Sequence, residues 1–559
     1  MTYLEDVPNT DIAGGHGTHV AGIIGGTGAA SGGRFEGVAP GADIVGYGSG
    51  AGLFILDTLG GFDYALSNQF EYNIRVVSNS FGATGDTGTA FDPDDPTNIA
   101  TKALADRGVV VVFSAGNAGS GEATITGNFK KAPWVVTVAA GDKGGRLSGY
   151  SSRGVDGGGG SVLVDGEPMQ WLDRPTVTAP GTDIYSTRAS TSDGLDLASI
   201  DQAIAEIGPG QAPFYTRLSG TSMAAPHISG VVALMLEANP SLSWREVKQI
   251  LQDTASNVPG RANWESGAGY VNAYAAVQAA LGAGEFGATV NGNRAFNASA
   301  LVSAAPETRH EIAFSPAGET GEVRFEVGAG VALVNARANV GDGTVALVLV
   351  DPSGTSYGSS IALPQIGQSI AVAAPGKPGT WTLTVRGIGA VSGVDLDPLG
   401  ASNGLSPPTT VTAFVKLVRT DGYTGLDDIA GHPAQGFIEA AVSKRLVDGD
   451  PDGRFRPDAV LTRAELASYL AMGAGLRQSD PLRGASFGDV PAFDDYAIEI
   501  QDATGAVRLS PPQHGRIEFA PLLEVWVGGG EYNVAYALSR LGLRTGWVGG
   551  LNSSPMRAA

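Results

Sequence analysis

The chain carries at positions 220–230 the stretch Gly220-Thr221-Ser222-Met223-Ala224-Ala225-Pro226-His227-Ile228-Ser229-Gly230. Small residues there deliver a serine to the start of a helix that continues through apolar residues to about Leu236. Ser222 would lie in the positive end of the helix dipole, which stabilises developing negative charge. We predict that Pro226 falls in or near the first helical turn, where a missing N–H costs least. The position suits a nucleophile whose attack creates an oxyanion, although in isolation an ordinary serine N-cap would look the same.

Two other stretches occur earlier in the chain: Gly15-His16-Gly17-Thr18-His19-Val20-Ala21-Gly22 and Ser114-Ala115-Gly116-Asn117. Together with residues 220–230, and in this order, they resemble the motifs of the subtilisin-like serine peptidases, the subtilases. The resemblance covers residues 1–283 of the 559. It implies an α/β fold with a parallel-sheet subtilisin-like catalytic domain, and hydrolysis of peptide bonds through an acyl-enzyme.

The resemblance assigns catalytic roles to three residues. Ser222 corresponds to the nucleophile and His16 to the general base, while Asn117 and the backbone N–H of Ser222 would form the oxyanion hole. His19 is expected to pack or to form hydrogen bonds rather than to act in catalysis. In isolation Asn117 would be an ordinary helix N-cap or turn residue, and only the combination of motifs favours the oxyanion role.

The resemblance also indicates where a substrate would bind. Ser80-Phe81-Gly82 corresponds to a segment whose backbone pairs with an extended peptide by strand addition. Ala115 and Gly116 would form one wall of the pocket for a substrate side chain. Proteins or peptides are therefore the expected substrates of this half of the chain.

The triad acid does not stand at the place that the family pattern requires. Subtilisin carries Asp, His and Ser in that chain order, and the family's Asp ends a buried strand. Asp6 and Asp11 lie too close to His16 and follow no apolar strand, and Asp11 matches a family position that is not the triad acid. We therefore expect the acid, its strand and a signal peptide to lie upstream of Met1.

Composition narrows the class of protein. The 559-residue chain has a formal net charge of −21, so its electrostatic field does not attract the phosphates of nucleic acid, which argues against a nucleic-acid-binding protein. It contains no cysteine, which excludes disulfides, a catalytic thiol and thiolate metal sites. No apolar run long enough for a transmembrane segment occurs. These features suit a secreted protein, and we expect an extracellular or cell-surface location.

Strand and helix signals alternate through the first half of the chain. Short apolar runs rich in β-branched residues predict buried strands at Ala42–Gly48, Arg75–Ser80, Val109–Phe113 and Pro133–Ala140. Helices are predicted at His16–Gly25, Leu56–Phe70, Ile99–Arg107 and after a capping box at Ser243 and Glu246. Residues 189–213 are predicted to form a loop with a short helix. Unbroken apolar strands joined by helices predict a parallel sheet that is covered on both faces.

From about residue 284 the apolar pattern changes to period two. It predicts the strands of an antiparallel β-sandwich at Glu322–Val327, Val345–Val350, Ser369–Ala373, Gly379–Arg386 and Thr410–Leu417. We assign residues 284–420 to this accessory domain. No residue in it predicts a catalytic site, and stabilisation of the enzyme and binding of a surface polymer both stay open as its role.

A third pattern occupies residues 421–475. It contains, in order, Leu426-Asp427-Asp428-Ile429, a predicted helix Gly436–Lys444, the turn Asp448–Gly453, Phe455-Arg456-Pro457 and Thr462-Arg463-Ala464-Glu465. The series resembles an S-layer homology module, a small helical unit that anchors proteins to bacterial cell-wall polysaccharide. An EF-hand calcium loop is the alternative for the Asp/Gly turn, but no glutamate stands at the required offset. Residues 476–504 resemble a partial second module, which begins at Phe487-Gly488-Asp489-Val490-Pro491.

The last segment, residues 505–559, resembles the start of a ribokinase-type sugar kinase, close to the 2-keto-3-deoxygluconate kinases. The resemblance rests on Val507–Pro512, Val527–Ala535 and Leu541–Thr545. The nucleotide site and catalytic base of that family lie further downstream than this chain reaches. A segment of this length cannot bury a core of its own, so we expect no contribution from it to the peptidase.

Many subtilases bind calcium, but the loop Gly26–Phe35 lacks carboxylates and amides, so no strong calcium site is predicted there. Other sites for a structural calcium ion stay open, and no other cofactor is indicated. The sequence thus predicts a cell-surface-anchored, extracellular subtilisin-like serine endopeptidase. The alternative is a non-catalytic surface or adhesion protein with a vestigial peptidase fold. The missing acid favours that alternative, and the intact His, Asn and Ser motifs oppose it.

Overall fold

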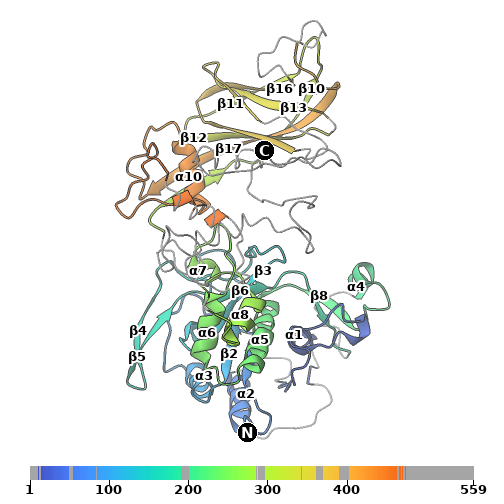
Figure 1. Cartoon of the computed structure of the whole chain (residues 1–559), viewed down its shortest axis with the longest axis vertical. Coiled ribbons are helices and arrows are strands. Elements are labelled where there is room, and N and C mark those ends of the chain that lie inside the picture. Colours follow the sequence, from blue (N-terminus) through green and yellow to red (C-terminus); the bar gives the residue numbers. More distant parts are fainter. Residues whose placement is uncertain are drawn as a thin grey trace, which may run out of the picture. The chain divides into compact units, whose positions relative to one another are not determined.

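The structure is a computed structural model of the 559-residue chain. It describes residues 10–11, 14–48, 55–83, 85–190, 200–284, 286, 296–341, 343–359, 369–388, 402–461, 465–466, 469 and 472–473. The chain divides into two compact units, a first unit of Met1–Ala295 with Thr462–Ala559 and a second unit of Phe296–Leu461 (Figure 1). Among the described residues, no helix has the length and apolar character needed to cross a membrane.

A parallel four-stranded sheet forms the centre of the first unit. Its strands, in spatial order, are β1 (Val76–Asn79), β2 (Val110–Ser114), β3 (Val135–Gly141) and β6 (Val177–Pro180). Every residue of β2 and β3 is buried. The prediction of a parallel sheet with unbroken apolar strands is therefore confirmed, because only a sheet covered on both faces lacks a polar side.

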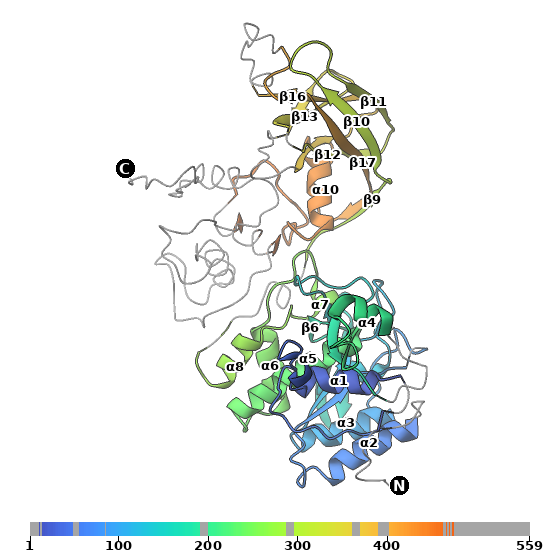
Figure 2. The ribbon, with the colours of Figure 1, turned by 90° about the vertical axis from the view of Figure 1, so that its right-hand side faces the viewer.

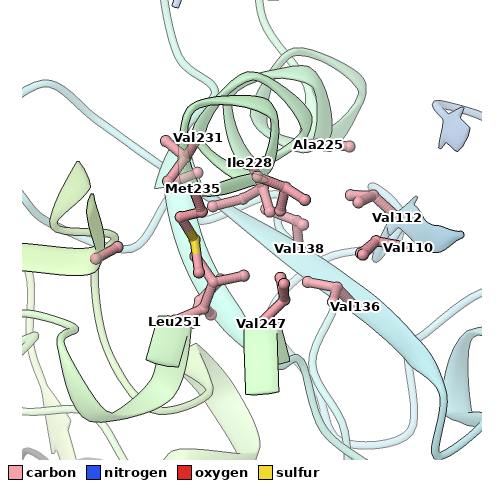
Figure 3. Packing of buried hydrophobic residues seen from close by; sticks show 14 of the residues in the cluster. Val110, Val112, Val136, Val138, Ala225, Ile228, Val231, Met235, Val247 and Leu251 are labelled. Carbon is pink, nitrogen blue, oxygen red and sulfur yellow. The ribbon is translucent and has the colours of Figure 1, made fainter. Parts of the chain in front are cut away.

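Helices cover both faces of this sheet. The helices of the first unit are α1 (His16–Gly25), α2 (Ile55–Ser67), α3 (Pro96–Asp106), α4 (Ile200–Ile207), α5 (Thr221–Ala238), α6 (Trp244–Asp253), α7 (Asn263–Ser266) and α8 (Ala273–Ala280). Val110 and Val112 of β2 pack against α5 (Figure 3). The alternate residues Val111 and Phe113 pack with side chains of α2 and α3, helices that lie together below α1 in Figure 2. Successive side chains of a strand point to opposite faces, so one strand joins both cores.

Local signals placed the predicted helices well. The bounds of α1 agree with the prediction, and α2 and α3 lie within a few residues of theirs. The capping box of α6 is confirmed, since Ser243 N donates to Glu246 Oε2 at 2.7 Å and Glu246 N donates to Ser243 Oγ. Pro226 is the sixth residue of α5, about two residues past the first turn, so it lies near that turn, as predicted, but not within it.

The predicted buried strand at Ala42–Gly48 is wrong. Residues 43–48 form no strand, and Ile44, Val45 and Tyr47 are 44%, 44% and 41% exposed. A strand requires a neighbour to accept and donate its backbone hydrogen bonds, and no strand of the described residues pairs with this segment. An apolar run in the sequence indicates that a segment can form a strand, but it does not indicate whether a neighbouring strand is there to pair with it.

Two antiparallel pairs complete the described part of the first unit. They are β4 (Gly159–Val164) with β5 (Glu167–Leu172), and β7 (Ile184–Thr187) with β8 (Tyr215–Leu218). Helix α4 lies between β7 and β8 in the chain, within the region predicted to be a loop with a short helix. The strand β8 leads directly into the turn before α5 and thereby positions Ser222.

The second unit contains two antiparallel sheets. One has β9 (Ser299–Ala304), β10 (Thr308–Phe314), β12 (Val331–Asn339), β15 (Ser369–Pro375) and β17 (Thr409–Thr424); the other has β11 (Glu322–Val327), β13 (Val345–Val350), β14 (Ser356–Gly358) and β16 (Gly379–Gly387). Side chains from both sheets form a single buried cluster around Trp381. Two antiparallel sheets with a shared core agree with the period-two prediction. The alternation is incomplete in the second sheet, where Val345–Leu347 of β13 and Leu383–Val385 of β16 are all buried.

The segment with the S-layer homology motifs belongs to the same second unit. Helix α10 (Gln435–Ser443) buries Ile438 and Val442 in a cluster with Leu426, Ile429 and Ala298. Strand β17 runs without a break across the expected boundary at residue 420. The second module, residues 476–504, and the kinase-like segment, residues 505–559, lie outside the described residues, as does most of Thr462–Glu465.

Candidate active site

Ser222 is the second residue of α5, the 18-residue helix that packs on one face of the parallel sheet. Gly220 precedes the helix, and its N–H donates to the carbonyl oxygen of Gly181 at 2.8 Å, which ties the turn to the end of β6. The Ser222 side chain is half-buried. A hydroxyl in this position faces the unpaired N–H groups of the first helical turn, where an oxyanion is stabilised.

Asn117 follows the carboxyl end of β2 and is held by the residue before the serine. Its Oδ1 accepts hydrogen bonds from both the N–H and the hydroxyl of Thr221, each at 2.9 Å. Both bonds use the amide oxygen, so the amide nitrogen is left for another partner. This nitrogen lies beside the turn that precedes Ser222, because a Cβ added to Gly220 would be 3.4 Å from Asn117 Nδ2. An exposed amide donor thus lies beside the candidate nucleophile.

Gly116 and Ala115 differ in what they present to that site. Gly116 has φ of 115°, and a Cβ there would lie 2.5 Å from Thr126 Oγ1 and 2.9 Å from Ser152 Oγ, so only glycine fits. Ala115 is fully buried, and its N–H donates to Val138 O within the sheet. Gly116 therefore borders Thr126 and Ser152, and the expected wall role of Ala115 remains a prediction.

His16 is the first residue of α1, which packs against α5 through Val20, Ile23 and Met223. Burial lowers the pKa of His16 below its ordinary value, and the charge of Asp11 opposes that effect. Asp11 Oδ2 accepts a hydrogen bond from Thr18 N at 2.6 Å, so this carboxylate caps the helix. A histidine kept neutral near pH 7 can take a proton from a hydroxyl. Within the described residues, no carboxylate is hydrogen-bonded to His16.

His19 has the structural role that the sequence indicated. It is fully buried, with Nε2 3.1 Å from Ile184 O and 3.2 Å from Thr216 O, so it joins α1 to β7 and β8. Burial lowers its pKa to about 4, because both backbone carbonyls only partly offset the loss of water. This histidine is neutral in the native protein at pH 7.

The segment Ser80-Phe81-Gly82 follows β1, at one end of the sheet order. Ser80 and Ser222 are joined by two hydrogen bonds, from Ser80 Oγ to Ser222 O at 2.8 Å and from Ser222 Oγ to Ser80 O at 3.2 Å. The Phe81 ring packs edge-on against Phe113, with ring centroids 5.5 Å apart. Phe81 and Gly82 form no backbone hydrogen bond with the described residues, so their backbone groups are available to an added strand.

Sequence reasoning missed two residues of this region. Thr221 orients the Asn117 amide, a role that depends on a contact between positions 104 apart in the chain. Lys130 is buried beside Thr126, although lysine is rarely buried without a partner. The adjacent lysines Lys130-Lys131, four residues before the buried strand β3 begins at Val135, were the available signal for a second unusual site.

The two loops considered for calcium are occupied by contacts within the protein. The loop Gly26–Phe35 is closed by its own backbone, with Gly33 N donating to Gly28 O and Gly37 N to Gly26 O. In the Asp/Gly turn, Asp448 accepts from the N–H groups of Asn297 and Ala298, and Asp450 and Asp452 pair with Arg456. The part of the chain that the structure describes holds no group of three or more His, Cys, Asp and Glu side chains suited to a metal ion.

Two family models match the chain. Residues 4–271 match the subtilase family, and residues 425–467 match the S-layer homology domain. The second match confirms the resemblance drawn from Leu426 onward, over the part of the segment that includes α10.

Known proteins share the first of these regions. Serine protease AprX of Bacillus subtilis (strain 168) is 32% identical over 46% of this chain and 57% of AprX. M-protease of Shouchella clausii (strain KSM-K16) is 30% identical over 50% of this chain and 58% of that protein. The chain thus spans little more than half the length of either relative. The solved structure of Sphericase is similar over 46% of this chain and 77% of that one, at 27% identity and a TM-score of 0.35.

Subtilisin DY of Bacillus licheniformis is 32% identical over 276 residues, which are 48% of this chain and 80% of that protein. The motifs around His16, Asn117 and Ser222 lie within the matched residues 4–271. The parallel sheet covered by helices on both faces agrees with this match. The chain therefore belongs to the subtilase family of serine endopeptidases.

Proposed function

We propose that this chain is a cell-surface serine endopeptidase in which Ser222 is the nucleophile, His16 the general base and then the general acid, and Asn117 an oxyanion donor. The observation that carries the proposal is the pair of hydrogen bonds from Thr221 to Asn117 Oδ1. They hold the Asn117 amide nitrogen on the same side of the α5 turn as Ser222. A donor fixed in advance needs no reorganisation as charge develops, and this is a large part of catalysis by such sites.

The reaction follows from these groups. Ser222 Oγ attacks the substrate carbonyl while His16 takes the hydroxyl proton, and the oxyanion accepts hydrogen bonds from Asn117 Nδ2 and Ser222 N. The C–N bond then breaks, and His16 gives its proton to the leaving amine. Water, with His16 again as base, attacks the acyl-enzyme and releases the acid. The unpaired backbone of Phe81 and Gly82 supports substrate binding by strand addition.

The S-layer homology match supports a location at the cell surface, with bacterial cell-wall polysaccharide as a partner of residues 425–467. The cluster of Leu426, Ile429, Ile438 and Val442 gives this segment a fixed scaffold on β9. A single module is expected to bind wall material weakly, because the avidity of linked copies is absent. Co-sedimentation of the full chain with purified wall, with and without competing wall polysaccharide, tests this partner.

Labelling of the full chain with a serine-directed fluorophosphonate tests the catalytic proposal. Ser222→Ala should abolish labelling, and His16→Ala should slow it strongly, because the base that activates the hydroxyl is lost. Ser241→Ala, at an exposed serine after α5, is the matched control and should label like the unmodified chain. A folded chain that is not labelled at all would instead support the alternative, a non-catalytic surface protein. One observation favours that alternative: among the described residues, no carboxylate is hydrogen-bonded to His16.

A further inference from the structure

Lys130 is a buried cation without an anionic partner among the described residues. Lys130 is the third residue of the 3₁₀ helix η2 (Asn128–Lys131), between β2 and β3, and is 2% exposed. Its Nζ donates to Thr126 Oγ1 at 2.9 Å. Burial alone lowers the pKa of this lysine to about 7. Buried ammonium groups are normally paired or fully hydrogen-bonded, so this one is exceptional.

Two other lysines of the first unit, the buried Lys131 and the half-buried Lys248, show how an ammonium group is satisfied by acceptors. Lys131 Nζ forms an ion pair with Asp173 Oδ2 at 2.9 Å and donates to Thr89 O at 2.6 Å. Lys248 Nζ donates to two backbone carbonyls, Pro133 O at 2.9 Å and Val135 O at 2.7 Å. Lys130 has one hydroxyl acceptor and the Phe129 ring, 6.0 Å from Nζ, in place of a carboxylate or two carbonyls. Its ammonium group therefore keeps a donor for a further acceptor.

The Lys130 ammonium lies where the two expected substrate-binding segments meet. A methyl group on Gly82 would overlap Lys130 Nζ and would lie 2.8 Å from Thr126 Oγ1. A methyl group on Gly116 would lie 2.5 Å from the same Thr126 hydroxyl. Gly116 immediately precedes Asn117, so this place is next to the position of the substrate carbonyl in the proposed site.

The hydroxyl groups of Thr126 and Ser152, near the ammonium group, can each donate a hydrogen bond, and neither carries a negative charge. Thr126 Oγ1 accepts from Lys130, and Ser152 Oγ accepts from Ala118 N at 3.0 Å. Each hydroxyl thus uses its oxygen, and no acceptor among the described residues takes its hydrogen. Both side chains are buried, at 5% and 0% exposure. The group of Lys130, Thr126 and Ser152, which we name the donor cluster, favours an anion.

We propose that the donor cluster binds the carboxylate of an acidic substrate side chain, so that this endopeptidase cleaves after Asp or Glu. The inference rests on the proposed function, because it assigns the substrate class of the same site. The carboxylate would pair with Lys130 Nζ and accept from the Thr126 and Ser152 hydroxyls. An amide or apolar side chain of equal size would leave the ammonium unpaired, and a basic one would add a second buried positive charge.

The test compares two matched peptides on the full chain. Succinyl-Ala-Ala-Pro-Glu p-nitroanilide and its Gln analogue differ only in the charge of the side chain before the scissile bond. The same two peptides, with a C-terminal amide in place of the p-nitroanilide, are also tested for how strongly they slow the labelling of Ser222 by fluorophosphonate. This protection measures peptide binding apart from turnover. We expect the Glu peptides to be preferred over Gln by roughly tenfold to hundredfold in kcat/KM and in protection.

Variants make the test specific. Lys130→Met and Lys130→Gln should reduce the Glu-to-Gln ratio to about one, while Lys143→Met, which removes an exposed lysine, should leave it unchanged. The two variants differ in polarity, so a folding defect of one does not remove the test. A ratio near one in the unmodified chain, or a ratio that persists in both Lys130 variants, overturns the inference while labelling of Ser222 still supports the peptidase. Absence of Ser222 labelling in a folded chain overturns the peptidase and the inference together.

Discussion

The carbonyl oxygen of Ser222 accepts its hydrogen bond from the hydroxyl of Ser80, at 2.8 Å, rather than from its own helix. In a regular helix this oxygen would accept from the N–H of the residue four positions later, which here is Pro226 and has no N–H. The proline thus frees a carbonyl that Ser80 satisfies, and Ser222 Oγ donates in return to Ser80 O. These two hydrogen bonds fix the position of Ser222, the proposed nucleophile, relative to Ser80 of the proposed substrate-binding segment.

Replacing Ser80 should weaken this positioning of Ser222. Ser80→Ala leaves the Ser222 carbonyl without its donor, which we expect to lower the free energy of unfolding by about 1–2 kcal/mol. Labelling of Ser222 by fluorophosphonate should slow by roughly tenfold, since small misplacements of a nucleophile are costly. Urea unfolding and labelling rates measure the two effects. Ser80→Thr keeps the hydroxyl and is the control; equal rates for the Ala variant and the parent would contradict the role given to Ser80.

We expect the Thr221 hydroxyl to affect turnover because it orients the Asn117 amide. Thr221→Val keeps the shape of the side chain but removes the hydroxyl that donates to Asn117 Oδ1 and accepts from Gly116 N at 3.1 Å. The amide is then held only by the backbone N–H of residue 221, so we expect turnover to fall roughly tenfold, mainly in kcat. Asn117→Leu, which removes the donor, should cost about 10²–10³. Thr221→Ser should behave like the parent, and a Val variant of full activity would show that the hydroxyl does not orient the amide.

His19 should make the first unit less stable in acid. Its pKa is about 4 in the folded protein and 6.5 for an ordinary histidine, so the unfolded chain binds more protons between these values. Stability is therefore fully present above pH 6.5 and is lost as pH falls toward 4, by about 3 kcal/mol for this residue.

Urea unfolding at pH 7 and pH 4.5 measures that loss. His19→Gln retains a donor for the Ile184 and Thr216 carbonyls but does not titrate, so its stability should fall less between the two pH values. A residual loss is expected from His227, whose pKa burial also lowers to about 4. An identical pH dependence for the variant and the parent would rule out His19 as a source of acid lability.

Two adjacent lysines should respond oppositely to the same substitution. Lys131→Met leaves Asp173 buried without its cation, which should destabilise the first unit by about 3–5 kcal/mol. Lys130→Met leaves no buried anion behind and should be neutral or stabilising at pH 6. That advantage should shrink as pH rises from about 7 toward 10.5, because the parent then releases the proton from Lys130. Thermal unfolding across this range measures both, and strong destabilisation by Lys130→Met would point to an unrecognised partner.

The fold of the first unit was largely predictable from local patterns. The continuous valine run of β2 required a sheet buried on both faces, and the capping box at Ser243 marked the start of α6. The period-two segments of the second unit likewise predicted β11 and β13 with the bounds that the structure gives. These features are encoded within single segments, because strand and helix periodicity depend on neighbours in the chain.

The sequence by itself determined the family, the candidate residues His16, Asn117 and Ser222, and most of the helices and strands. Only the tertiary structure decided that Ala42–Gly48 forms no strand, since pairing needs a partner that the segment itself does not specify. It also decided that Thr221 orients Asn117 and that the Lys130 ammonium lies against Gly82. These contacts join residues far apart in the chain, and no local pattern encodes the position of an atom relative to a distant segment.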